Sequence, residues 1–170
     1  MTAASDFTEA VRALTAALRQ ALPVADAIRL LPALAAQAGP TITGALCRRI
    51  AVVEACRASA SYQPASYDEA AALRAMLCEL LDVEIIRAGD EGEDATWRAL
   101  RRLLAAVVRD LTARGASLAP LVEVRQRRSL PSLVLANRLY QDAEREAELV
   151  ARVDPRSPLF MPMAFTALAR

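Results

Sequence analysis

The spacing of apolar residues changes once along this chain, close to residue 120. Between residues 6 and 114, apolar residues recur at intervals of three and four, which is the spacing of amphipathic helices. Beyond that point the chain alternates, with Glu123, Arg125 and Arg127 between Val122, Val124 and Gln126, as in a half-buried strand. Because the two spacings bury their apolar faces differently, we expect a helical bundle of about five helices at 1–118 and a small mixed module at 119–170.

Three helices are predicted in the first 60 residues, at 6–21, 24–37 and 41–59. Asp6 is the expected cap of the first helix, and Pro32 inside the second predicts a kink or a break. Arg48, Arg49 and Arg57 are assigned to the solvated face of the third. The apolar residues expected to face the core are Phe7, Val11, Leu14, Leu18, Leu22, Ile28, Leu31, Leu34, Ile42, Leu46, Ile50 and Val53.

Two longer helices follow, and the short turn at 89–94 predicts that they form an antiparallel hairpin. Ser66 and Glu69 make a capping box, so the fourth helix should begin near Tyr67. Asp94 is the expected cap of the fifth, which ends before Gly115. The fourth helix is apolar on more than one side and is therefore the expected centre of the bundle. The core positions expected in these helices are Leu73, Met76, Leu77, Leu80, Leu81, Val83, Ile85, Trp97, Leu100, Leu104, Val107, Val108 and Leu111.

The residue types of the chain argue against an enzyme. All 21 basic residues are arginine, and the chain contains no histidine. The commonest general base, the usual partner of a nucleophile and the commonest zinc ligand are therefore missing. The acidic turn at 90–94 lacks the distal glutamate of a calcium loop, and no glycine-rich phosphate loop is present. We expect no catalytic residues, no metal, no cofactor and no enzymatic activity.

Charge and cysteine content limit the partners and the compartment. With 20 acidic residues against the arginines, the net charge is +1, whereas binding to nucleic acid or an anionic membrane needs an excess of positive charge. Cys47, Cys56 and Cys78 are an odd number and lie in apolar helical patterns, which indicates reduced thiols. No secretory leader and no apolar run of roughly 18 residues is evident. We expect a protein of a reducing cytoplasm that does not enter a membrane.

The last 50 residues are predicted to order as strand, helix, helix, strand. Ser129 and Pro131 should begin the first of these helices, and two prolines after residue 154 should end the second. The final strand is expected at 165–168, antiparallel to the first strand. Residues expected inside this module are Leu133, Leu135, Ala136, Leu139, Tyr140, Ala147, Leu149 or Val150, Val153, Leu159, Phe160 and Met161.

This order resembles a LysM-like β-α-α-β module, and residues 135–142 look like the first-helix pattern of that fold in phage tail proteins. The fragments 62–74, 107–118 and 131–140 resemble, in the same order, the C-terminal portion of the DNA circularisation family of Mu-like phages and prophages. The resemblance covers roughly residues 40–170. Two segments differ from the family pattern, Arg152–Asp154 and Met161–Met163, and a helical region stands where the family usually has a further N-terminal domain.

The resemblance implies a structural virion component: a protein-docking element of a phage, prophage or tail-derived particle, in the tail tip or baseplate hub. Its partners would be other tail or baseplate proteins, with the chain itself a homo-oligomer within a ring. It would be made in the bacterial host cytoplasm and then reside in the virion tail. The candidate contact residues are Arg125, Arg127, Arg128, Arg138 and Tyr140 of the C-terminal module.

Two other functions stay open. The family name suggests a factor that binds DNA ends after injection. The balanced charge and the lack of a basic stripe with interleaved aromatic residues do not favour it. LysM-like folds can also bind peptidoglycan, which needs a groove with polar and aromatic groups. Tyr140 and Phe160 are the candidate aromatic contacts in this module.

Overall fold

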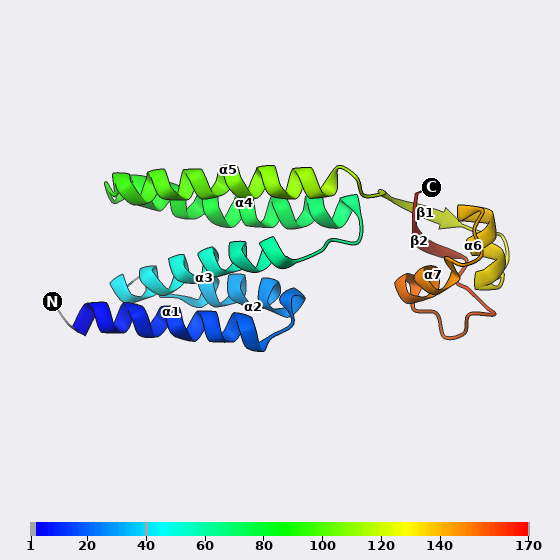
Figure 1. The fold of residues 1–170 in the computed structure, drawn as a ribbon, viewed down its shortest axis with the longest axis horizontal. Coiled ribbons are helices and arrows are strands. Elements are labelled where there is room, and N and C mark those ends of the chain that lie inside the picture. Colours follow the sequence, from blue (N-terminus) through cyan, green and yellow to red (C-terminus); the bar gives the residue numbers. More distant parts are fainter. Residues whose placement is uncertain (1–2, 40, 170) are drawn as a thin grey trace. The chain divides into compact units, whose positions relative to one another are not determined.

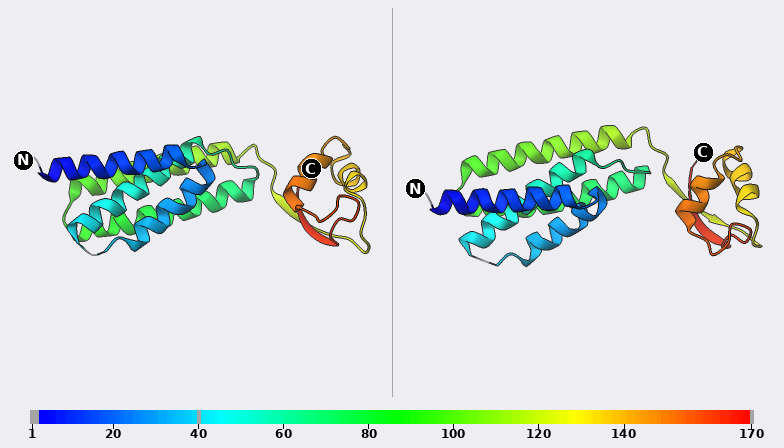
Figure 2. Two further views of the ribbon diagram at one scale, coloured as in Figure 1. Left: turned by 90° about the horizontal axis from the view of Figure 1, so that it is seen from below. Right: turned by 60° about the horizontal axis from the view of Figure 1, so that its bottom comes forward.

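The structure is a computed structural model that describes residues 3–39 and 41–169; for residues 3–8, 15, 18 and 19 only the backbone is described. The chain divides into two compact units, which Figure 1 and Figure 2 draw together. The helical unit comprises residues 1–64 and 70–114, and the small unit comprises 65–69 and 115–170. The small unit thus begins at Gly115, where the sequence predicts 119, and it includes the first turn of the fourth helix. The two units are described separately below.

The described part of the helical unit consists of five helices: α1 (Ala3–Ala21), α2 (Val24–Gln37), α3 (Ile42–Ser61), α4 (Tyr67–Asp90) and α5 (Asp94–Gly115). In Figure 1 α3 lies between α2 and α4, with α5 beyond α4. A single core of mainly Leu, Ile, Val and Ala side chains joins α2, α3, α4 and α5. Ala51, Ala55 and Ala58 of α3 are fully or almost fully buried, so neighbouring helices approach α3 closely on several sides. The central helix is therefore α3, and the prediction that α4 holds this place is wrong.

Side-chain caps fix where these helices begin and end. Ser66 Oγ accepts from the Glu69 amide at 3.2 Å, and Glu69 Oε2 accepts from the Ala65 amide at 2.7 Å. The predicted start of α4 at Tyr67, with Ser66 as its cap, is confirmed; Glu69 accepts from the amide before the cap residue, one position earlier than in a standard capping box. At the C-terminal end of α3, the Arg114 guanidinium donates to the carbonyl oxygens of Ser59, at 3.0 Å, and of Tyr62. A cation from α5 thus satisfies carbonyl groups at the C-terminus of α3.

Several expectations for the helical unit are wrong. Helix α1 begins three residues before Asp6. Of the kink or break expected at Pro32, the break does not occur, since α2 continues through Pro32, and the tertiary contacts of Ile28, Leu31 and Ala35 offset the one backbone bond that proline removes. Apolar residues predicted for the core but exposed are Leu14, Leu34, Ile42, Val83 and Trp97. They lie at helix ends or beside the rows of buried residues, and these rows are narrower than the rows of apolar residues in the sequence. The side chains of Phe7 and Leu18 lie outside the described residues.

The small unit has the predicted β-α-α-β order: β1 (Leu121–Arg125), α6 (Ser132–Tyr140), α7 (Glu146–Val153) and β2 (Ala164–Leu168). The strands pair antiparallel, with Leu121 opposite Leu168 and Arg125 opposite Ala164. Both helices end in a left-handed residue, Gln141 and Asp154. A separate core lies between the helices and the sheet, formed by Leu135, Ala136, Tyr140, Leu149, Met161, Phe165 and Ala167. The predicted fold class, mainly helical with a small two-stranded antiparallel sheet, is confirmed.

Replacing Arg114 with alanine should lower the free energy of unfolding of the full chain by about 1–3 kcal/mol, because two carbonyl groups at the end of α3 lose their charged donor. Urea denaturation followed by circular dichroism measures the effect. Arg109→Ala is the matched control, since Arg109 is exposed and, among the residues that the structure describes, bonds to Ala105 of its own helix alone. Equal effects of the two substitutions would contradict the capping role.

Candidate functional site

The arginines predicted as contacts lie on the surface of the small unit. Arg125 ends β1, its side chain is 78% exposed, and its Nε lies 2.9 Å from a carboxylate oxygen of Glu123. Arg127 and Arg128 follow in the loop after β1, and Arg138 lies in the last turn of α6; all three are exposed. Arg125, Arg127 and Arg128 lie close together along the chain, whereas no contact within the described part of the chain links Arg138 to them. Scattered positions of this kind are typical of the edge of a protein interface and not of a site around one small ligand.

Tyr140 is not exposed, and its assignment as a surface contact is wrong. Its side chain packs in the core of the small unit, and the residue keeps only 6% of its accessible surface. The reason is its position at the end of α6, one turn after the buried Ala136. The Arg145 guanidinium covers the ring at 3.8 Å from the centroid. Arg145 also bonds Glu148, and this hydrogen bond raises the pKa of the arginine.

A group of exposed apolar residues was not predicted as a site. Leu159 is 64% exposed, Phe160 72% and Met163 59%, and Leu133 on α6 is 50% exposed. We call these four residues the apolar loop surface. Leu133, Leu159 and Phe160 were expected inside the module, but only Met161 of the segment 159–161 is buried. Three consecutive apolar residues in a loop have no period, so the sequence pattern does not tell which one points inward.

Backbone hydrogen bonds hold the loop that carries this surface. The Ser132 amide donates to the Pro158 carbonyl at 2.8 Å, and the Met161 amide donates to the Leu130 carbonyl at 3.1 Å. Ser129 Oγ donates to the Met161 carbonyl at 2.7 Å, so Ser129 does not cap α6 as predicted. The Gln126 amide donates to the Met163 carbonyl at 2.7 Å and extends the sheet beyond β1. These bonds place residues 158–163 beside the segment 126–132, which carries Arg127 and Arg128.

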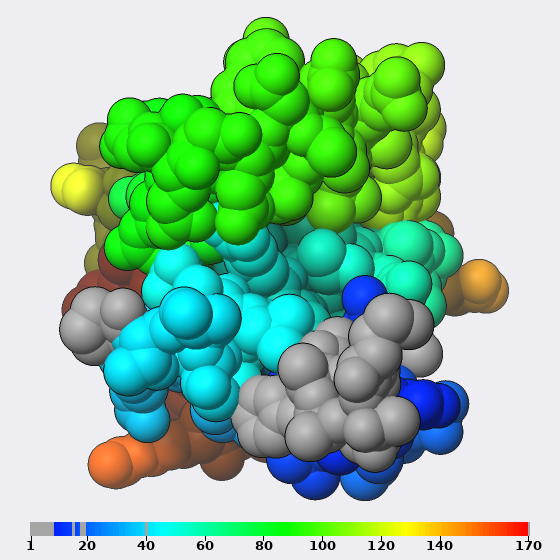
Figure 3. All heavy atoms as spheres, turned by 90° about the vertical axis from the view of Figure 1, so that its left-hand side faces the viewer, coloured from blue at the N-terminus to red at the C-terminus, as the bar shows by residue number. Residues whose placement is uncertain are grey.

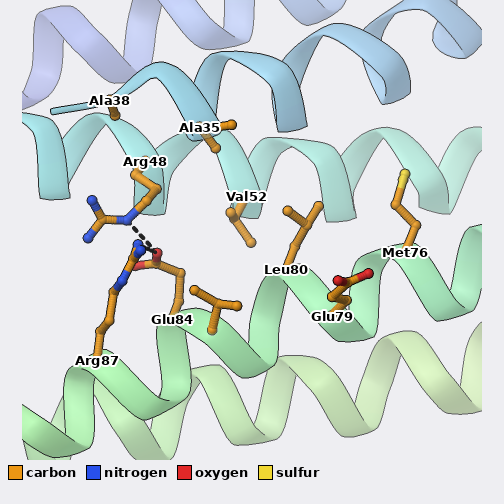
Figure 4. Close-up of a pocket in the computed structure, with 11 residues that line it drawn as sticks. Ala35, Ala38, Arg48, Val52, Met76, Glu79, Leu80, Glu84 and Arg87 are labelled. Atoms are coloured by element: carbon orange, nitrogen blue, oxygen red, sulfur yellow. Dashed lines mark hydrogen bonds and ion pairs between the residues drawn. The ribbon is translucent and has the colours of Figure 1, made fainter.

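The helical unit has a different polar centre. Glu84 of α4 is 1% exposed, and its Oε1 accepts from Arg48 Nε of α3 and from Arg87 Nη1 at 2.8 Å. Its Oε2 lies 3.6 Å from Arg49 Nε. Figure 4 shows Arg48 and Arg87 converging on Glu84 from two helices. We call Glu84 and these three arginines the Glu84 cluster. The assignment of Arg48 and Arg49 to a solvated face is wrong, since their side chains are only 13% and 20% exposed.

Arg49 extends the Glu84 cluster to the turn between α4 and α5. Its guanidinium lies 2.7 Å from Glu91 and 2.6 Å from Glu93. Figure 3 views this end of the helical unit, where the green α4–α5 turn lies against the cyan first turns of α3. The acidic turn considered as a calcium loop thus supplies partners for an arginine of α3. Arg57, in contrast, is 65% exposed as predicted, and it pairs with the buried Glu54 at 2.6 Å.

Among the described residues, the potential nucleophiles and metal ligands do not form a recognisable reactive or metal-binding site. Cys47, Cys56 and Cys78 are free thiols. Burial, and to a lesser extent the nearby Cys78, raises the pKa of Cys56 from its ordinary value of 9.0 to about 12, so the thiol stays protonated and unreactive. Within residues 3–39 and 41–169 no group of three or more cysteine, aspartate or glutamate side chains is arranged to hold a metal ion. Among the same residues no helix combines the length and apolarity needed to span a membrane.

Comparison with known proteins adds no assignment: no protein-family model matches the chain, and no curated protein matches it.

Replacing Glu84 with glutamine should lower the free energy of unfolding by about 3 kcal/mol, because Arg48, Arg49 and Arg87 then lose their shared buried counter-charge. Glu79→Gln is the matched control on the same helix, since Glu79 is exposed and forms no ion pair among the described residues. Urea denaturation compares the two variants. A Glu84→Gln protein as stable as the Glu79→Gln protein would refute the role given to the Glu84 cluster.

The raised pKa of Cys56 predicts an alkaline effect on stability. A group whose pKa is higher in the folded than in the unfolded protein stabilises the fold fully below the unfolded value. The contribution of Cys56 should therefore be present below about pH 9 and be lost as the pH rises towards 12.

In a protein that keeps Cys56 alone (Cys47→Ser, Cys78→Ser), a disulfide reagent at pH 8 should modify the thiol only after unfolding by urea. Rapid modification of the folded protein would disprove the burial argument.

Proposed function

We propose that the chain is a structural protein-docking element of a phage, prophage or tail-derived particle, placed in the tail tip or baseplate hub. The observation that carries the docking role is the apolar loop surface, which combines exposed Leu133 of α6 with three exposed apolar side chains on a loop fixed by backbone hydrogen bonds. The tail assignment is supported by the sequence resemblance of residues 62–74, 107–118 and 131–140 to the DNA circularisation family. On this proposal the protein is not an enzyme.

The composition of the surface favours a protein partner. Protein interfaces combine a centre of aromatic and large aliphatic residues with a polar rim in which arginine is enriched. Phe160 and Leu159 provide such a centre, and Arg127 and Arg128 lie in the segment that is hydrogen-bonded to their loop. Burial of each apolar side chain would contribute about 2 kcal/mol. Because the loop is already fixed in place, little ordering entropy opposes docking.

The expected partners are other tail or baseplate proteins, with copies of this chain arranged in a ring. On this proposal the protein is made in the bacterial host cytoplasm and then resides in the virion tail. Arg125, Arg127, Arg128 and Arg138 would act at the rim of the contact. Their charges would fix orientation and association rate more than affinity, since exposed ion pairs are weak.

Replacing Leu159 and Phe160 together with aspartate should block incorporation into particles. Both side chains are exposed, so the variant should fold as the wild type does, which circular dichroism checks. The test restores the gene to a phage or prophage that lacks it and measures the chain in purified particles by immunoblot. Leu30→Asp is the matched control, because Leu30 is an exposed leucine of the helical unit, 48% accessible.

Two outcomes would overturn the proposal. Normal incorporation of the double variant would remove the docking role of this surface. Normal particles combined with a loss of salt-dependent DNA binding after Arg127→Gln and Arg128→Gln would assign the chain to the binding of DNA ends.

A further inference from the structure

A partly open cavity of about 390 Å³ lies in the helical unit between the end of α2, α3 and α4 (Figure 4). Its apolar wall includes Val52 of α3 and Leu80 and Val83 of α4. On the side of α2 the lining residues are alanines, Ala35 and Ala36 among them, which are too small to fill the space. The size is within the range of cavities that bind small ligands. We call this cavity the α2–α4 slot.

The slot has a charged end formed by the Glu84 cluster. Arg48 and Arg87 both line it, and each donates one N–H group to Glu84 Oε1. A guanidinium carries five N–H donors. Among the described residues the remaining donors of these two side chains have no partner, and Figure 4 shows the Nη atoms of Arg48 pointing away from Glu84. Two positive groups with unused donors therefore stand at one end of an apolar channel.

We propose that the α2–α4 slot binds a single-chain amphiphile with an oxyanion head. The head accepts from the unused N–H groups of Arg48 and Arg87, in the charge-assisted geometry that guanidinium groups favour. The apolar chain runs along α4 past Val83 and Leu80 towards Met76. Met76 and Arg87 both line the slot and are 11 residues apart on one helix, about 16 Å along its axis. That length suits a medium-length alkyl chain.

The neighbouring charges favour an anion over a cation. The carboxylate of Glu84 is already shared by Arg48, Arg49 and Arg87. Beyond the two arginines a second hollow is lined by Asp90 and Glu91, but Glu91 is held by Arg49 at 2.7 Å. Exposed Glu79 lies at the apolar end, away from the proposed head position.

Isothermal calorimetry measures binding of decanoate, decanol and decyltrimethylammonium to the full chain, with decanol below its solubility limit and the two ionic amphiphiles below their critical micelle concentrations. Saturable binding of decanoate at one site per chain, at least about tenfold tighter than decanol, is expected, because the alcohol lacks the charge that two arginines recognise. Decyl phosphate in a further titration separates the two head chemistries, and tighter binding than decanoate would identify phosphate as the preferred oxyanion. Equal affinity for decanol, preference for the cation, or no saturable binding would overturn the proposal.

Matched variants locate the site. Ala36→Phe should abolish binding by filling the slot from its exposed rim, whereas Ala33→Phe, one turn earlier at an exposed position outside the slot, should leave it unchanged. Arg87→Gln should weaken decanoate binding about tenfold, while Arg98→Gln on α5 should not. Decanoate binding that survives Ala36→Phe would place the ligand elsewhere and refute the proposal. Failure of decanoate to bind, with chain self-association lost only in Ala36→Phe, would assign the slot to a second copy of the chain.

Discussion

The helical unit depends on one buried carboxylate. Glu84 is almost completely withdrawn from water, so its charge would destabilise the fold by several kcal/mol without a partner. Arg48 and Arg49 of α3 and Arg87 of α4 compensate it. The ion pair between Arg48 and Glu84 links α3 directly to α4. Through Glu91 and Glu93, Arg49 ties the α4–α5 turn to the same helix.

The same cluster and the alanines of α2 and α3 explain where the unit is tightly packed and where it is open. Alanines on α3 let its neighbours approach, and small cores of this kind gain stability from close packing. At the end of α2 alanines face the charged groups of α4, and an open slot remains. The small unit is built differently. Its core uses larger side chains, including Tyr140, Met161 and Phe165, and its exposed apolar residues lie on a loop fixed by backbone bonds.

Features with a local cause could be predicted from the sequence. The alternation around Val124 and the prolines near residues 131 and 155 were sufficient for the β-α-α-β order, and the Ser66 capping box gave the start of α4. Features with a non-local cause could not. Arg48 and Glu84 are 36 residues apart, and nothing in the periodicity of either helix shows that they meet. Phe160 is exposed because its neighbour Met161, in the same aperiodic loop, is the residue that packs into the core of the small unit.

The central claim is that the ion pair between Arg48 and Glu84 organises the helical unit, and a double-mutant cycle tests it most directly. The free energies of unfolding of wild type, Arg48→Met, Glu84→Gln and the double variant would be measured by urea denaturation. A coupled buried pair predicts that the double variant is more stable than the sum of the single effects implies, by about 1–3 kcal/mol. Single effects that add within about 0.5 kcal/mol would show that the two side chains act independently and would contradict the account.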